Sequence, residues 1–296
     1  MFDVTSNPGG DGFVGKIQGF FAYLLSRLTG TVDSIPVSLE DKIILLDNDE
    51  LLLVWENTLR EKRLKKEEEA WKSFEKRYGR GAPEVTAAFI KWQEQLYAFI
   101  EQEKDRFLKE RHGSKEALGA LLRAGAKTIV VTKGAKPYTE KCFNLVGLSP
   151  YISDIYSPAP GRREKRFVDA VVDHGKNTPR KCSMDTIIVG HDLEKDMGWD
   201  LVPPKGLPND GNAPIFILFG ALKFDRDIED PLDALLEITL LLAKRGKNDF
   251  LNGFKSIDKP QKAVTQNYSF KVSLYHNPKR GDKARIPVIH EIRKRR

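Results

Sequence analysis

Residues 42–53 of this chain read KIILLDNDELLL. Four consecutive apolar residues, Ile43 to Leu46, are typical of a short strand that is buried on both faces. Asp47 and Asp49 follow at once, so the sequence predicts two carboxylates at the carboxyl end of a hydrophobic strand. Two like charges are costly there unless a cation or a substrate binds them, although a plain polar turn would also account for the pair. In open α/β sheets, ligands bind at this end of the strands.

The composition is that of a globular protein with a sizeable core. The 296 residues are 40% hydrophobic and 31% charged, which suits one large domain or two modest ones. The two cysteines, Cys142 and Cys182, have no metal-ligand spacing and form no disulfide framework, which favours a reducing, cytoplasmic compartment. Charged residues interrupt the apolar stretch Phe13–Leu28, so we expect neither a signal peptide nor a membrane span.

The net charge of +7 comes from the C-terminal end of the chain. Residues 244–296 hold 15 Lys and Arg against 4 Asp and Glu, which leaves residues 1–243 with 34 against 38. We interpret residues 244–296 as a basic C-terminal extension, within which Ser269–Tyr275 alternates enough to form a strand. Such an extension could be solvated, bind a protein partner or bind nucleic acid.

Two further segments are predicted to lie outside the main body of the protein. Residues 1–40 are predicted as an N-terminal extension with an amphipathic helix at residues 14–29, which would pack on the body or on a second copy of the chain. Residues 51–112 are predicted as an insert of two charged helices, Glu56–Tyr78 and Glu84–Arg111, separated by a Gly/Pro-rich break.

Residues 41–50 and 113–243 are predicted to form an α/β core. Strands that alternate with helices imply βαβ units, and hence a Rossmann-like parallel sheet covered on both faces. The expected strands are Ile43–Leu46, Thr128–Val131, Asp154–Tyr156, Thr186–Val189 and Pro214–Phe219. The expected helices are those near residues 117–125, Lys136–Val146, Arg163–Asp173 and Pro231–Ala243.

Polar residues follow three of these strands and could converge in one crevice. They are Asp47 and Asp49, then Thr132 and Lys133, then Asp192 and Asp196. A basic cluster that includes Lys165 lies between the second and third of these groups. Carboxylates that can hold Mg²⁺, a hydroxyl and a lysine together make the set needed to bind and transfer a phosphoryl group.

With these motifs the sequence resembles the haloacid dehalogenase (HAD) superfamily, most of whose members are phosphatases. LLDNDEL at residues 45–51 matches the first motif, a strand followed by DxD. KEALGALLRAGAKTIVVTKG at residues 115–134 resembles the second, a helix–Gly–strand–Thr unit. Lys165 is the best match to the third motif, and IIVGHDLEKD at residues 187–196 resembles the fourth. The resemblance covers residues 41–243 and gives the insert the place of an all-helical cap.

The resemblance implies a Mg²⁺-dependent phosphatase that acts through an aspartyl-phosphate on a small or medium phosphorylated substrate. Asp47 would be the nucleophile and Asp49 the general acid and base. Thr132, with Lys133 and Gly134, would bind the phosphoryl group, and Lys165 would offset its charge. Mg²⁺ would lie between Asp47, the backbone carbonyl of Asp49, and Asp192 or Asp196.

The sequence departs from the family pattern after the first motif and in the fourth. Glu50 and Leu51 stand where Gly-Thr is common, and His191 stands where many members have the first aspartate. The basic extension suggests a second hypothesis, a nucleic-acid-associated protein that uses it. Its body would be a nucleotide-end phosphatase or a catalytically silent scaffold. A third, weaker hypothesis makes the N-terminal helix a homodimer contact.

Overall fold

The computed structural model describes residues 38–40, 42–48, 51–102, 107–162, 167, 170, 186–190, 215–218, 231–245, 260–276 and 285–295. The predicted N-terminal helix lies outside these residues, as does most of the helix predicted at Arg163–Asp173. Within the part of the chain that is described, no helix is both long enough and apolar enough to cross a membrane.

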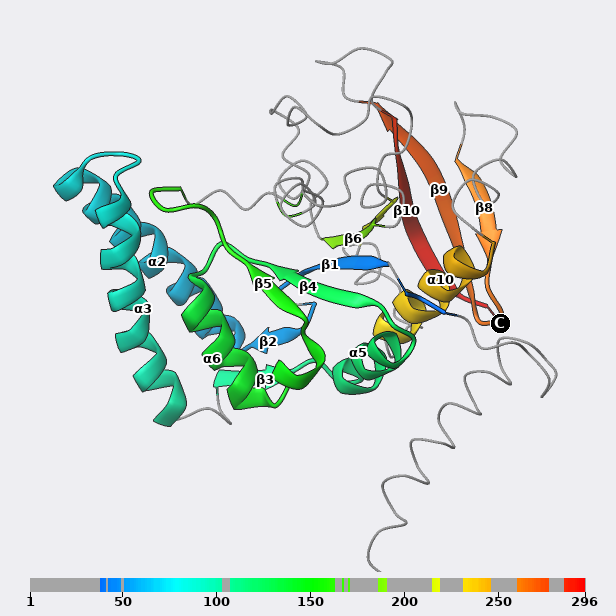
Figure 1. The fold of residues 1–296 in the computed structure, drawn as a ribbon, viewed down its shortest axis with the longest axis horizontal. Coiled ribbons are helices and arrows are strands. Elements are labelled where there is room, and N and C mark those ends of the chain that lie inside the picture. Colours follow the sequence, from blue (N-terminus) through cyan, green and yellow to red (C-terminus); the bar gives the residue numbers. More distant parts are fainter. Residues whose placement is uncertain are drawn as a thin grey trace, which may run out of the picture.

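One eight-stranded sheet, in the order β5-β4-β1-β6-β7-β10-β9-β8, forms the centre of the molecule (Figure 1). Its parallel strands are β1 (Ile43–Asp47), β4 (Lys127–Val131), β5 (Asp154–Tyr156), β6 (Thr186–Gly190), β7 (Ile215–Leu218) and β10 (Arg285–Lys294). The chain builds outward from β1 on one side and then returns to build outward from β6 on the other. This is the doubly wound order of a Rossmann-like α/β fold, which confirms the predicted fold class.

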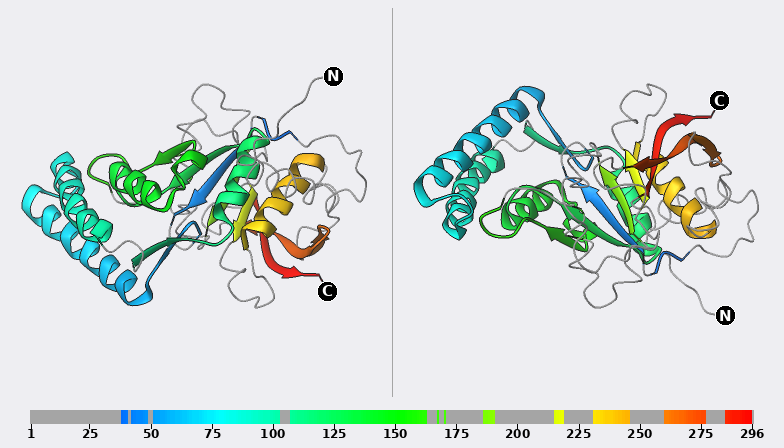
Figure 2. Two further views of the ribbon diagram at one scale, coloured as in Figure 1. Left: turned by 90° about the horizontal axis from the view of Figure 1, so that it is seen from below. Right: turned by 90° about the horizontal axis from the view of Figure 1, so that it is seen from above.

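Helices cover the sheet and complete the core. They are α5 (Ser114–Arg123), α6 (Lys136–Val146), the short 3-10 helix η1 (Ser149–Tyr151) and α10 (Pro231–Arg245). α5 and α10 pack against each other beside the sheet (Figure 2). All five residues of β1 are buried, because the strand is paired on both sides and covered by helices. Its neighbours in the core include Leu118, Val130, Phe143, Val189 and Leu235.

The insert that follows β1 contains two long helices on a short β-ribbon. α2 (Asn57–Tyr78) and α3 (Pro83–Gln102) pack side by side as a hairpin, and β2 (Leu53–Trp55) pairs with β3 (Leu108–Glu110) at its base. The prediction that the second helix runs to Arg111 is therefore wrong. Buried Leu108 alternates with exposed Lys109, and the Arg111 N–H donates to the Leu52 carbonyl at 2.9 Å, so the segment is extended.

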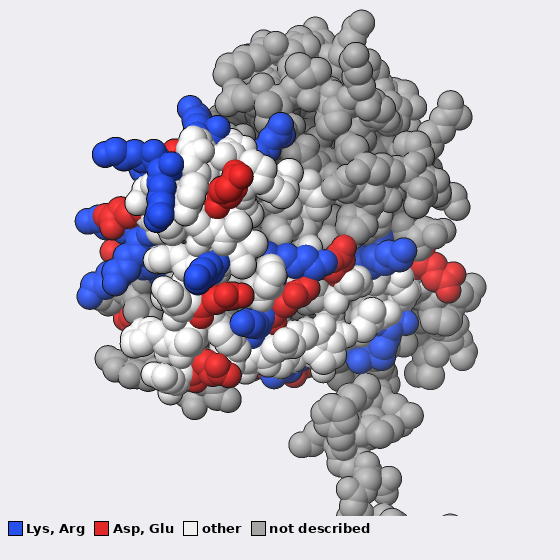
Figure 3. Space-filling model, turned by 60° about the vertical axis from the view of Figure 1, so that its left-hand side comes forward, with Lys and Arg blue, Asp and Glu red and all other residues white. Residues whose placement is uncertain are grey.

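The outer face of the insert is a solvated surface. Basic and acidic side chains are interspersed over the face that Figure 3 presents. On α2 they include exposed pairs one helical turn apart, Lys72 with Glu68 at 3.3 Å and Lys65 with Glu69 at 4.0 Å. Such pairs each stabilise a helix by a few tenths of a kcal/mol, about 0.3–0.5. This pattern agrees with the interpretation of the charge run as a solvated helix face.

The basic C-terminal segment contributes strands to the central sheet. β10 pairs in parallel with β7, and the antiparallel strands β9 (Tyr268–His276) and β8 (Gln261–Val264) follow at the edge. The prediction that the last core strand is Pro214–Phe219 is therefore wrong, and the strand predicted at Ser269–Tyr275 is confirmed. The apolar residues here come in short groups between charged ones, yet Phe270, Ile289 and Ile292 are almost fully buried.

The strands β8, β9 and β10 form a C-terminal ribbon. Two carboxylates of α10 hold this ribbon against the core. The Asn267 backbone N–H donates to Glu237 Oε2 at 3.2 Å, and its side-chain amide donates to Glu237 Oε1. Tyr268 Oη donates to Asp233 Oδ2 at 3.0 Å. Glu237 is 1% exposed, so its hydrogen bonds replace those that water would make.

Replacing Glu237 with Gln is therefore expected to destabilise the whole domain rather than the C-terminal end alone. The amide nitrogen of Gln would face one of the two Asn267 donors and leave it without an acceptor beside a buried side chain, at a cost of about 1–3 kcal/mol. Urea unfolding followed by circular dichroism measures this loss. Glu61→Gln, at an exposed position of α2, should change stability by less than about 0.5 kcal/mol. Equal stability of Glu237→Gln and the wild type would show that the ribbon is not anchored here.

A histidine on the same ribbon makes stability depend on pH. His290 Nε2 lies 2.6 Å from Ser273 Oγ, and the side chain is 20% exposed. Burial lowers the pKa of His290, and nearby Lys271 acts in the same direction, while Glu291 opposes it. The folded protein therefore binds a proton at His290 less readily than the unfolded chain does.

Stability is expected to fall as pH falls through the ordinary histidine range near about 6.5, because the unfolded state takes up the proton first. Melting temperatures at about pH 7.5 and about pH 5.5 test this. The drop between them should be smaller in His290→Gln than in the wild type. Replacing the exposed His112 with Gln serves as the control. An equal drop in His290→Gln and the wild type would contradict the expectation.

Candidate active site

Asp47 is the last residue of the central strand and lies where the direction of strand order reverses. β4 and β5 extend the sheet on one side of β1, and β6, β7 and β10 extend it on the other. In doubly wound sheets the loops at such a point diverge and leave a crevice beyond the carboxyl ends of the strands. The fold thus brings Asp47 to the edge at which this architecture binds ligands.

The carboxylate of Asp47 is held by the chain that follows it. Asp47 is 8% exposed, and its Oδ1 accepts the Asn48 backbone N–H at 2.7 Å. The Asn48 carbonyl in turn accepts the N–H groups of Leu52 at 3.2 Å and Leu53 at 3.3 Å, so the chain turns back directly into β2. The turn fixes the carboxylate of Asp47 at the strand end and also starts the insert.

Thr132 stands on the neighbouring strand end, immediately after β4. Asp47 pairs with Val131, so Thr132 follows directly after the residue that lies beside Asp47. The Thr132 backbone N–H donates to the Tyr156 carbonyl at 3.0 Å, and its Oγ1 accepts the Gly134 N–H at 3.0 Å. Because the hydroxyl oxygen serves as acceptor here, the hydroxyl proton can be donated to a ligand.

The remaining predicted site residues differ in their placement. Lys133 is exposed and Gly134 is half-buried. Asp49, Lys165, Asp192 and Asp196 lie outside the described residues. β6, the strand that precedes Asp192 in the sequence, ends at Gly190. Val189 pairs with Leu46, so the end of β6 lies level with Asp47. The structure therefore places Asp47 and Thr132 at the ends of neighbouring strands, and the convergence of the site residues stays a prediction.

The described oxygen atoms at the end of β1 fit a hard cation. Mg²⁺ prefers carboxylate and carbonyl oxygens, and Asp47 supplies a buried carboxylate. Asn48 Oδ1 is a second buried oxygen, with no hydrogen-bond partner among the described residues. Within that part of the chain, no cluster of three or more His, Cys, Asp or Glu residues could hold a metal.

Gln93 of α3 reaches the loop after β4, and sequence reasoning missed it. Its side chain is fully buried, and its Oε1 accepts the Ala135 backbone N–H at 3.0 Å. The signal was available in the sequence, because a glutamine stands in the otherwise apolar stripe of α3 that includes Phe89 and Ile100. A buried polar residue in such a stripe needs a partner, and here the partner belongs to the core.

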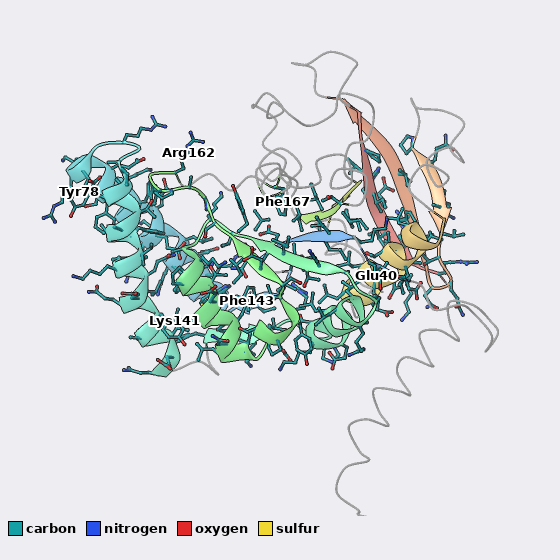
Figure 4. All side chains as sticks on the ribbon, viewed as in Figure 1. Glu40, Tyr78, Lys141, Phe143, Arg162 and Phe167 are labelled. Atoms are coloured by element: carbon teal, nitrogen blue, oxygen red, sulfur yellow. The ribbon has the colours of Figure 1, made fainter. Side chains whose placement is uncertain are left out.

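The insert makes a second contact with the core at the opposite end of its hairpin. Thr86 Oγ1 accepts the Gly161 backbone N–H at 2.7 Å. Gly161 has φ +78°, and a Cβ at this position would overlap the Gly81 carbonyl, so glycine is required. Figure 4 shows Arg162 beside the end of the insert that carries Tyr78. This loop leads directly into the basic cluster that contains Lys165.

Further side chains of the insert pack around α6. Arg63 and Glu67 form a buried ion pair at 3.1 Å, and the Arg63 guanidinium lies 4.2 Å from the centre of the Trp55 ring. Burial raises the pKa of the Tyr138 hydroxyl well above its ordinary value. Lys141 lies 5.1 Å from the centre of the Tyr97 ring. The insert is thus packed against the helix that follows Thr132.

Comparison with known proteins gives similarities of structure alone. No protein-family model matches the chain, and no curated protein matches it. A haloacid dehalogenase-like hydrolase from Xanthomonas campestris is 17% identical, with a TM-score of 0.38 over 72% of this chain and 96% of the other. A candidate HAD hydrolase from Bacillus subtilis, solved with magnesium, is 16% identical. Its TM-score is 0.37 over 60% of this chain and 88% of the other.

A third similar structure, described as a predicted phosphoglycolate phosphatase from Haemophilus somnus, is 15% identical, with a TM-score of 0.34 over 53% of this chain and 80% of the other. Sequence identities and superpositions at this level do not assign a family or a substrate.

Proposed function

We propose that the protein is a Mg²⁺-dependent phosphatase of the HAD type, which hydrolyses a small or medium phosphoric monoester. The observation that carries the proposal is the buried Asp47 carboxylate at the end of β1, beside Thr132 at the end of β4. A carboxylate beside a hydroxyl donor at a switch point suits nucleophilic attack on phosphorus. The sequence motifs at residues 45–51, 115–134 and 187–196 support the same assignment.

In the proposed reaction Asp47 attacks phosphorus, forming a P–O bond to its carboxylate while the P–O bond to the leaving group breaks. Asp49 gives its proton to the leaving oxygen, and then takes a proton from the water that attacks phosphorus and releases phosphate from Asp47. The Thr132 hydroxyl donates to an oxygen of the transferring group. The positive charge of Lys165 offsets the negative charge on the transferring phosphoryl group.

Mg²⁺, held by Asp47, the Asp49 carbonyl and Asp192 or Asp196, would neutralise charge on the phosphoryl oxygens. The side-chain oxygens of Asp47 and Asn48 at the strand end support this assignment. The insert would exclude water and select the substrate, since it begins four residues after Asp47 and its helix α3 contacts the loop after Thr132.

The contacts of the C-terminal ribbon weaken the alternative of a nucleic-acid-associated protein. Several basic residues of the segment 244–296 have partners inside the fold. Lys271 pairs with Glu291 at 2.5 Å, and Arg295 Nη1 donates to the Thr265 carbonyl at 2.9 Å. Deleting residues 245–296 would remove three strands of the sheet, so such a truncation would not test nucleic-acid binding cleanly. Neutralising exposed basic side chains one by one tests that alternative without truncation.

Asp47→Asn is expected to abolish Mg²⁺-dependent hydrolysis of p-nitrophenyl phosphate, lowering kcat by about three orders of magnitude or more, because an amide cannot form the acyl-phosphate. Steady-state kinetics with and without Mg²⁺ measure this. Glu116→Gln removes an exposed carboxylate of α5 and should keep wild-type activity. Full activity of Asp47→Asn would rule out the proposed nucleophile.

Thr132→Val is expected to lower kcat/KM by about a hundredfold, because it removes a hydrogen-bond donor to the transferring group. Thr132→Ser keeps the hydroxyl and its bond to the Gly134 N–H, so its loss should stay below about tenfold. The same assay with p-nitrophenyl phosphate measures both variants. Equal losses in the Ser and Val variants would contradict the proposed role of the hydroxyl, because only the Val variant lacks it.

A further inference from the structure

Three polar side chains from two parts of the fold surround one point beside Gly134. A Cβ at Gly134 would lie 3.2 Å from Thr139 Oγ1, 3.4 Å from Thr132 Oγ1 and 3.7 Å from Gln93 Nε2. Thr132 and Thr139 belong to the core, whereas Gln93 belongs to helix α3 of the insert. A side chain at position 134 would crowd the point where these three groups meet, and glycine avoids that crowding.

The orientation of the Gln93 amide is fixed by its partner. The Ala135 N–H can only donate, so the atom that faces it at 3.0 Å must be the carbonyl oxygen Oε1. The nitrogen Nε2 is consequently turned toward Thr132 and Gly134. It is fully buried and has no hydrogen-bond partner among the described residues. A buried amide donor without a partner is costly, unless a ligand accepts its hydrogen.

The groups around this point are suited to an anion. Ala135 is the N-cap of the eleven-residue helix α6, where the helix dipole favours negative charge. The Thr132 oxygen already accepts the Gly134 N–H, so its proton is left to donate. Thr139 Oγ1 donates to the Ala135 carbonyl at 3.2 Å. Gln93 Nε2 therefore adds a second side-chain donor next to that of Thr132.

We infer that Gln93 is the residue through which the insert binds the substrate's phosphoryl group, with Nε2 donating to one of its oxygens while Oε1 holds the Ala135 N–H. The inference rests on the proposed phosphatase function and names a substrate-contacting residue for it. Because Gln93 stands on α3, phosphoryl binding and the docking of the insert on the core stabilise each other.

Two substitutions separate this role from a purely structural one. Gln93→Glu keeps an acceptor for the Ala135 N–H but replaces the donor with an acidic oxygen. Gln93→Met keeps the approximate volume and loses both functions. If Gln93 only holds the loop through Oε1, Gln93→Met is the more damaging change. If Nε2 contacts the phosphoryl group, Gln93→Glu is the more damaging change, because a negative oxygen then faces an anion.

The probe is inorganic phosphate, used as a competitive inhibitor of p-nitrophenyl phosphate hydrolysis at about pH 8, where glutamate is ordinarily ionised. The inhibition constant is expected to rise about a hundredfold in Gln93→Glu and about tenfold in Gln93→Met. Gln95→Glu makes the same chemical change on the exposed face of α3 and should leave the constant unchanged. Circular dichroism establishes that each variant is folded.

The increase in melting temperature caused by phosphate provides an independent measure of the same binding. It should be present in the wild type and in Gln95→Glu, and absent in Gln93→Glu. Tight phosphate binding by Gln93→Glu, or a greater loss in Gln93→Met, would overturn the inference while leaving the phosphatase proposal intact. A wild-type protein that neither hydrolyses the ester nor binds phosphate would overturn both.

Discussion

The burial of the Asp47 carboxylate at the end of a doubly paired strand is the constraint on which the candidate site depends. β1 is paired on both sides along its length, so the position and direction of its last residue are set by the whole sheet. A charge held at this depth needs donors or a cation around it. The Asn48 N–H supplies one donor within the chain, and the strand order opens the crevice in which others can approach.

The insert is tied to the loops that leave the two strands on one side of β1. Gln93 contacts Ala135 after β4, and Thr86 contacts Gly161 after β5. Those loops carry Thr132 and precede the basic cluster with Lys165. A movement of α3 would therefore change the surroundings of groups proposed to bind the phosphoryl oxygens. This arrangement gives the insert a physical route to influence the chemistry, beyond covering the crevice.

The sequence predicted the core best where one signal dominated. The strand at Ile43–Leu46 and the helix at Lys136–Val146 were found because continuous apolar runs and clear helix ends leave little choice. β10 was missed because its apolar residues are interrupted by Pro287 and flanked by charges, and its burial depends on pairing with β7, far away in the sequence. Gln93 stood out only as a glutamine within an apolar helix stripe, and its partner could not be predicted because a backbone N–H carries no sequence signal. Asp49, Lys165, Asp192 and Asp196 stay predictions.

The central claim is that Asp47 becomes phosphorylated during turnover. Quenching the reaction with borohydride during hydrolysis reduces an acyl-phosphate to the alcohol, and peptide mass spectrometry locates the reduced residue. We predict homoserine at position 47, formed only when both Mg²⁺ and substrate are present. Active turnover with an unmodified Asp47, or with the reduced residue elsewhere in the chain, would contradict this account.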